Sequence, residues 1–115
     1  MAILEIRTYR LGPGTRDEFV RVMRTEALPL LAKFGIRVLD CGPSLTDEDG
    51  NEEAFLMRGF SSLEQRAEQE DRFYSSSAWR EGPREAILDP IENFHTIVME
   101  VPESALAALD RSRTA

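Results

Sequence analysis

The sequence predicts an α+β fold in which four antiparallel strands form one sheet and two helices cover one of its faces. Side chains of residues 3–11 alternate between two faces, as in a strand. Two later segments carry helix-start signals, and the predicted order is strand, helix, strand, strand, helix, strand. This order is the split βαβ arrangement, and right-handed connections would place the first strand between the third and the fourth.

The composition indicates a single domain. A chain of 115 residues with 42% hydrophobic residues can bury a core without disulfides or a structural metal. Its single cysteine, Cys41, cannot form an internal bridge, and we see neither a leader nor an apolar run near 18 residues, so we expect a soluble cytoplasmic protein with no membrane partner. A net charge of -7 and scattered arginines argue against nucleic acid as a partner.

The first strand has one apolar face and one mixed face. Leu4, Ile6 and Thr8 share the apolar face. The mixed face carries a set of apolar and charged side chains: Ile3, Glu5, Arg7 and Tyr9. Such a face either contacts water or lines a polar cavity.

The first helix is expected to begin at Thr15 or Arg16, after a turn over residues 12–14. Thr15 and Glu18 have the spacing of a capping box. An apolar stripe continues to Phe34, and Gly35 is a typical left-handed residue after a helix.

Pro29 lies inside this helical stripe. Proline removes one helical hydrogen bond and crowds the preceding turn, so we predict a kink over residues 25–28 of a continuous helix. A second helix that starts at Pro29 is the alternative.

Residues 36–41 and 54–60 are predicted to pair as the second and third strands, joined by the polar connection 44–53. On the third strand, Phe55, Met57 and Gly59 should share one face, opposite to Leu56, Arg58 and Phe60. The acidic residues of the connection lack the spacing and the flanking helices of a calcium loop, so we expect no metal there.

The second helix should begin near Ser61 or Ser62, which form overlapping capping boxes with Glu64 and Gln65. The serine run 75–77 should interrupt it, and Trp79 would anchor a short irregular or helical piece. Residues 91–101 form the predicted fourth strand. These elements make up the predicted domain, residues 1–102, and the tail 103–115 is expected to hold a short helix and to fray at its end.

A sheet with helices on one face leaves its other face uncovered. We expect this open face to carry a set of apolar side chains: Tyr9, Leu39, Leu56 and Phe60. Covering such a patch favours a homodimer that packs sheet against sheet.

Several sequence fragments resemble the NIPSNAP family: residues 4–9 with Leu11 and residues 13–14, residues 26–31, residues 35–36, Arg58 before Phe60, and residues 62–64. The resemblance implies a ferredoxin-like domain that forms a dimeric α/β barrel, akin to the antibiotic-biosynthesis monooxygenase type. It implies no reaction. Where many relatives carry aromatic residues around the third-strand arginine, this chain has Met57 and Gly59.

Four residues are the candidates for lining a ligand pocket: Arg7, Tyr9, Arg58 and His95. Arg7 and Arg58 on neighbouring strands could direct two guanidinium groups at one carboxylate. Alternatively, Glu5 and Glu52 neutralise them as structural ion pairs. His95 is the only histidine, so a general base or a haem ligand would be sought there, although a lone strand histidine is more often simply packed.

Two functions stay open at this stage. One is a small enzyme or binding protein that uses no cofactor and takes a small apolar or carboxylate-bearing molecule. The other is an interaction or structural module whose interior is filled by its own side chains. The sequence assigns no catalytic residue.

Overall fold

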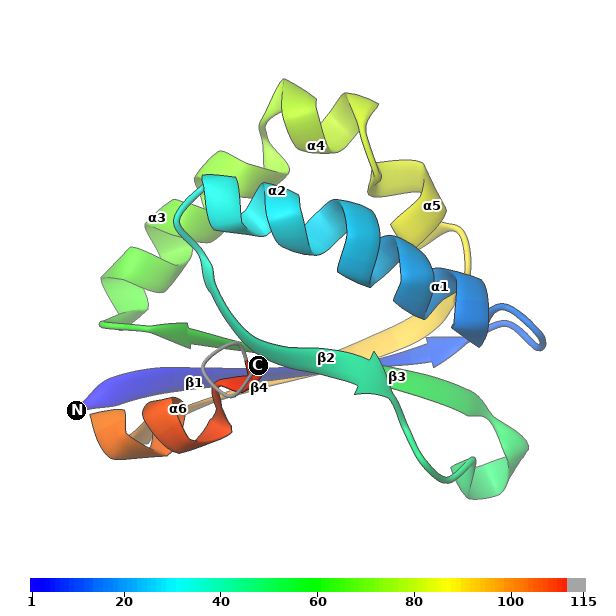
Figure 1. The fold of residues 1–115 in the computed structure, drawn as a ribbon, viewed down its shortest axis with the longest axis horizontal. Helices are drawn as coiled ribbons and strands as arrows, with labels where there is room; N and C mark the ends of the chain where they lie inside the picture. The colour runs from blue at the N-terminus through cyan, green and yellow to red at the C-terminus, as the bar shows by residue number, and fades with distance from the viewer. Residues whose placement is uncertain (112–115) are drawn as a thin grey trace.

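The computed structural model describes residues 1–111 and shows a four-stranded antiparallel sheet with helices packed above it (Figure 1). The strands are β1 (Ala2–Leu11), β2 (Arg37–Pro43), β3 (Glu52–Phe60) and β4 (Ile91–Val101). Their order in the sheet is β2-β3-β1-β4, which confirms the predicted central position of the first strand. β1 also pairs with the last strand, β4, where Ala2 lies opposite Val101.

The register of β1 decides which side chains meet. Glu5 lies opposite Arg58 of β3. Ile3 and Tyr9 belong to the core beneath the helices, whereas Leu4 belongs to a smaller cluster on the other face. The mixed face of β1 therefore points at the helices.

The residues expected on the open face lie elsewhere. Tyr9, Leu56 and Phe60 are buried in the core beneath the helices. The expectation for these three residues was wrong. The face of β1 that carries Ile3, Glu5, Arg7 and Tyr9 is the one that packs against the helices, and Leu56 and Phe60 of β3 lie on the same side of the sheet. Leu39 does lie on the opposite face, where it packs with Leu106 of the C-terminal helix α6 (Glu103–Leu109).

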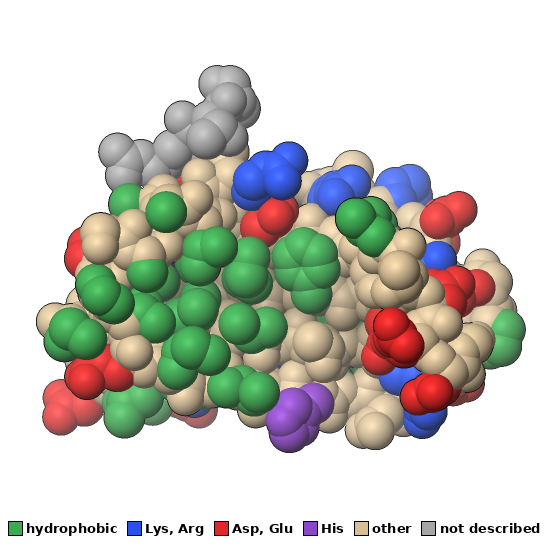
Figure 2. Space-filling model, turned by 90° about the horizontal axis from the view of Figure 1, so that it is seen from below, with side chains coloured by type: hydrophobic (Ala, Val, Ile, Leu, Met, Phe, Trp, Pro, Cys, Tyr) green, Lys and Arg blue, Asp and Glu red, His purple; other side chains and the backbone are tan. Residues whose placement is uncertain are grey.

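The opposite sheet face nevertheless exposes apolar side chains (Figure 2). Ile97 and Met99 of β4 are 50% and 38% exposed, and they pair with Ile6 and Leu4 of β1. Met57 is paired with Ile6 on the other side. We call Ile6, Met57, Ile97 and Met99 the open-face patch.

The first helical segment runs through Pro29 without interruption. It consists of α1 (Arg16–Val22), the π-helical turn η1 (Met23–Ala27) and α2 (Leu28–Lys33). Ala27 and Leu28 keep helical dihedral angles, so the predicted continuity is confirmed. Where we expected a kink, the Leu28 N–H donates to the Met23 carbonyl, five residues back. This wider turn accommodates a proline, which lacks an N–H and crowds the turn before it.

The start of α1 is capped from a distant residue. Thr15 has φ -101 and ψ -10, a helical conformation in which its side chain caps nothing, so the predicted capping box with Glu18 is wrong. The Thr15 hydroxyl donates to the Gly12 carbonyl at 2.6 Å instead. The Glu52 carboxylate accepts from the N–H groups of Gly14 at 2.8 Å and Arg16 at 3.0 Å. A carboxylate at a helix N-terminus is also favoured by the helix dipole.

The second helical region begins and breaks where the sequence predicts. Its helices are α3 (Leu63–Tyr74), α4 (Ser77–Glu81) and α5 (Arg84–Leu88), and the short helix η2 (Glu48–Gly50) lies in the hairpin connection. The Ser62 hydroxyl accepts from the Gln65 N–H at 3.0 Å. The serine run separates α3 from α4, and Trp79 is buried against Tyr74, with ring centroids 5.4 Å apart.

Helix α6 covers part of the face opposite to the other helices. Leu106 is 1% exposed, and a Cβ atom at Gly59 would lie 2.9 Å from its Cδ1 atom, so a larger residue at position 59 would make the Leu106 side chain shift. Arg37 of β2 pairs with Glu103 at 2.8 Å. The first part of the predicted tail is thus packed on the sheet, and the expected fraying lies outside the described residues.

Candidate functional site

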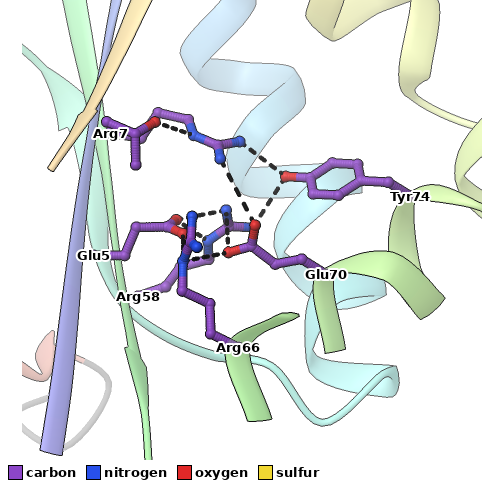
Figure 3. A network of polar contacts seen from close by, with 7 residues as sticks. Glu5, Arg7, Arg58, Arg66, Glu70 and Tyr74 are labelled. Atoms are coloured by element: carbon purple, nitrogen blue, oxygen red, sulfur yellow. Dashed lines mark hydrogen bonds and ion pairs between the residues drawn. The ribbon is translucent and has the colours of Figure 1, made fainter. Parts of the chain in front are cut away.

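A buried network of charges connects the sheet to α3 (Figure 3). Its centre is the cross-strand pair of Glu5 and Arg58, whose side chains are both 0% exposed. Arg58 Nε donates to Glu5 Oε1 at 2.7 Å, and Arg66 Nε donates to Glu5 Oε2 at 2.6 Å. Buried charges of this kind are tolerated only when they are paired and hydrogen-bonded.

Helix α3 contributes Arg66, Glu70 and Tyr74, which share one helix face because they are four residues apart. Glu70 Oε2 lies 3.2 Å from both Arg58 Nη2 and Arg66 Nε. The Tyr74 hydroxyl oxygen accepts from Arg58 Nη1 at 3.0 Å and from Arg7 Nη1 at 3.2 Å.

Arg7 is the member of the network with the weakest carboxylate contact. Its Nη2 atom lies 3.9 Å from Glu70 Oε1, beyond hydrogen-bond distance. Its Nε donates to Thr96 Oγ1 at 3.0 Å, and its guanidinium carbon lies 5.6 Å from the centroid of the Phe94 ring. The Arg7 side chain is 16% exposed, so this end of the network reaches solvent.

The network contains three guanidinium groups and two carboxyl groups, so positive charge is in excess. Burial alone would raise the pKa of Glu5, but the hydrogen bond with Glu70 and the charges of Arg58 and Arg7 lower this pKa to about 2. Burial and the hydrogen bond to Glu5 raise the pKa of Glu70 to about 7, against the charge of Arg58. Glu70 is therefore the carboxyl group that takes up a proton near neutral pH.

Apolar side chains fill most of the space between the helices and the sheet next to this network. The remaining cavity has a volume of about 20 Å³, and its lining includes Tyr9, Leu56, Tyr74 and Trp79. Burial is the main reason that the pKa of Tyr9 is raised to about 12. A cavity of this size is close to the lower limit for one water molecule.

The structure brings three of the four candidate residues to one side of the sheet. Arg7, Tyr9 and Arg58 all point at the helices. His95 pairs with Thr8 and is exposed on the opposite face, where it borders an open hollow of about 280 Å³. It is therefore not part of the charge network.

The ion-pair interpretation of the two arginines holds in part. Glu5 does pair with Arg58, as that interpretation proposed. Glu52 contacts neither arginine and caps α1 instead.

The contributions of α3 to the network were not predicted from the sequence. Arg66, Glu70 and Tyr74 recur at four-residue intervals, which places polar groups along the helix face that also carries Phe73 into the core. This polar stripe is the sequence pattern that could have indicated a polar site on α3. It could not show which strand residues the helix would meet.

The described residues show neither a metal site nor a membrane-spanning helix. Within residues 1–111, no three His, Cys, Asp or Glu side chains are grouped so as to hold a metal ion. Over the same residues, every helix is too short or too polar to cross a membrane.

The antiparallel sheet with split βαβ connections defines a ferredoxin-like α+β domain. More specifically, the chain belongs to the NIPSNAP family, whose sequence profile matches residues 4–101.

Solved structures of NIPSNAP proteins have the same fold. A NIPSNAP family protein from Agrobacterium tumefaciens is 22% identical, with a TM-score of 0.75, over 90% of this chain and 95% of that one. A second protein from that organism, described as having unknown function, is 26% identical, with a TM-score of 0.73, over 87% of each chain. An uncharacterised NIPSNAP domain protein from Burkholderia xenovorans is 19% identical, with a TM-score of 0.75, over 87% of this chain and 94% of that one.

The fold also extends to another class of protein. A putative antibiotic biosynthesis monooxygenase from Bordetella bronchiseptica is 16% identical, with a TM-score of 0.66, over 88% of this chain and 97% of that one. No curated protein matched the chain. These likenesses show the fold, and the profile match over residues 4–101 shows the family.

Proposed function

We propose that this NIPSNAP protein binds a small, largely apolar molecule through a carboxylate, with Arg7 as the recognition residue. The observation that carries the proposal is the incomplete pairing of Arg7. Its nearest carboxylate oxygen is 3.9 Å away, in a network with more guanidinium groups than carboxyl groups. A bound carboxylate would supply the missing negative charge in the forked geometry that a guanidinium favours.

The surroundings of Arg7 fit such a ligand. Phe94 stacks near the guanidinium and is 58% exposed, so it offers an aromatic surface next to the charge. Tyr74 and Thr96 hold the guanidinium from two sides, which limits its rotation. A partly preorganised cation loses less entropy on binding than a free surface arginine.

The test is titration of the protein with benzoate by isothermal calorimetry, with Arg7→Ala and Arg10→Ala as matched variants. Arg10 follows on the same strand but points away from the helices and is exposed. We expect Arg7→Ala to weaken benzoate binding at least tenfold and Arg10→Ala to leave it unchanged. Absence of benzoate binding to the parent protein, or a folded Arg7→Ala variant with the parent's affinity, would refute the proposal.

A second candidate function is a non-enzymatic interaction or structural module. The specific observation in its favour is the cavity of only about 20 Å³ beneath the helices, because side chains occupy the space that a larger ligand would need. Native mass spectrometry of freshly purified protein separates the two. A retained small molecule favours ligand binding, and repeated isolation of the bare chain favours the module.

We further propose that the protein is a cytoplasmic homodimer in which the open-face patches of two copies face each other. The patch supports this arrangement because two of its side chains are at least 38% exposed at the solvent side of an otherwise packed sheet. Burying apolar surface of this kind is the main driving force of stable association. The single buried cysteine fits a reducing compartment.

A further inference from the structure

We propose that Glu70 moves a proton to and from a carbon atom of the bound molecule, so that the site interconverts the keto and enol forms of a small 2-oxo acid. This inference rests on the proposed function, because Arg7 must hold the substrate carboxylate. It adds an activity, a substrate class and a catalytic residue to a binding site.

One carboxyl group of the network is placed to gain and lose a proton more readily than the other. Arg58 and Arg66 each contact both Glu5 and Glu70, so the two carboxyl groups are held side by side. Glu5 has the shorter contacts, 2.5 Å to Arg58 Nη2 and 2.6 Å to Arg66 Nε, whereas Glu70 lies 3.2 Å from the same two atoms. Glu5 therefore keeps the negative charge, and Glu70 is the group that gains and loses the proton.

The second step is access. Glu5 and Arg58 are 0% exposed and cannot reach a ligand, whereas the side chains of Glu70 and Arg7 are 15% and 16% exposed. These two partly exposed side chains also lie next to each other, because Arg7 Nη2 is 3.9 Å from Glu70 Oε1. A carboxylate on Arg7 would place the neighbouring carbon atoms of the ligand near Glu70.

The third step is stabilisation of the charge that forms on oxygen. The Tyr74 hydroxyl oxygen accepts hydrogen bonds from two guanidinium groups, those of Arg7 and Arg58. Among the described residues it has no further hydrogen bond, so its own proton is free to be donated to a ligand oxygen. Two cationic donors make this hydroxyl a strong donor toward an enolate, in the manner of an oxyanion hole.

The chemical step balances without an oxidant, a reductant or a metal. The Glu70 carboxylate takes a proton from the carbon next to the ketone, and the C–H electron pair becomes the C=C bond. The former carbonyl electron pair moves to oxygen, which the Tyr74 hydroxyl stabilises. The protonated Glu70 then gives its proton to that oxygen, which yields the enol and regenerates the carboxylate, and the reverse sequence restores the ketone.

The rate should rise with pH as Glu70 becomes the carboxylate base. The charged and titratable groups that face it are Glu5 and Arg7 from β1, Arg58 from β3, and Arg66 and Tyr74 from its own helix. The pKa of Glu70, raised to about 7 by burial and by the hydrogen bond to Glu5, places this rise around neutral pH.

The experiment measures exchange of the C3 protons of phenylpyruvate in D2O by proton NMR. We compare the wild type with Glu70→Gln and with Glu68→Gln, a control on an exposed position of the same helix. The wild type should accelerate exchange at least tenfold over buffer, Glu70→Gln should lose the acceleration, and Glu68→Gln should keep it. Tyr74→Phe should lower kcat, because the hydroxyl stabilises the enolate, and should also raise KM to a smaller extent, because Tyr74 holds Arg7.

Binding of benzoate, measured on the same samples, separates this inference from the proposed function. A wild type that binds benzoate without accelerating exchange overturns the acid–base role and leaves the binding site standing. A wild type that neither binds nor accelerates overturns both. Exchange by Glu70→Gln at the wild-type rate also overturns the inference, and if that variant fails to fold, full activity in Tyr74→Phe together with a flat pH profile does so.

Discussion

At the scale of single residues, the buried pair of Glu5 and Arg58 is the most consequential contact in the molecule. Neither side chain has any exposed surface, and each sits opposite the other on neighbouring strands. The energetic value of such a pair lies less in its attraction than in the cost of leaving one partner alone in the interior.

We therefore predict that Arg58→Met destabilises the protein by roughly 3–5 kcal/mol, because it leaves Glu5 buried with Arg66 as its remaining close partner. The double variant Glu5→Leu with Arg58→Met should be less destabilised than Arg58→Met alone. Urea unfolding followed by circular dichroism measures both, and Arg10→Met at an exposed position of β1 is the control. A double variant that is the least stable of the set would contradict this view of the pair.

A second prediction at this scale concerns pH. The pKa of Glu70 is raised from 4.5 to about 7 on folding, so between these values the folded state binds more protons than the unfolded state. The free energy of unfolding should then fall as the pH rises from 4.5 to about 7, by up to about 3 kcal/mol from Glu70 alone. Glu70→Gln should lack this decline, which urea unfolding at pH 5 and pH 8 would reveal as a difference between the two proteins. Parallel pH profiles would count against the raised pKa.

At the scale of the elements, the sequence predicts the strands and helices well and their contacts less well. The alternation of the first strand, the serines before α3 and the continuity through Pro29 depend on neighbouring residues only, and these predictions are confirmed. The cap of α1 comes from Glu52, which is 36 residues away from Arg16. No local pattern indicates such a contact.

The same limit applies to the site. The alternation of side chains along β1 correctly placed Arg7 and Tyr9 on the same face, and the predicted strand order placed Arg58 of β3 next to them. Partners from α3 depend on how that helix is rotated over the sheet, which the sequence leaves open. His95 lies on the far side because β4 pairs it with Thr8, and the sequence does not fix the register of that pairing.

Helix α6 provides the prediction at this scale. Leu106→Ala should destabilise the protein by about 2–4 kcal/mol, because Leu106 is almost completely buried between α6 and the sheet. Leu109→Ala, on the same helix but 37% exposed, should have a much smaller effect. Thermal unfolding of the two variants side by side tests this, and equal losses would mean that α6 does not pack as described.

At the scale of the whole molecule, the open-face patch predicts the assembly. Light scattering should return twice the chain mass of 13.0 kDa over a wide concentration range. Ile97→Glu should give a monomer, because it places a charge in the patch. Leu63→Glu is the matched control, since Leu63 is 61% exposed but lies at the start of α3 on the other side of the sheet. A wild-type monomer at micromolar concentration would rule out the dimer.

The strand order has a consequence for how the chain reaches its native state. The central strand β1 is the first of the four strands to be made, but one of its two neighbours is β4, and Ala2 meets Val101 only after all the residues between them exist. Such long-range pairing slows folding, because a large loop must close before the contacts form. On the ribosome, β1 can pair with β3 while its other edge stays unpaired. We expect the sheet, and with it the Arg7 contact to Thr96 of β4, to be completed only after β4 has emerged from the ribosome.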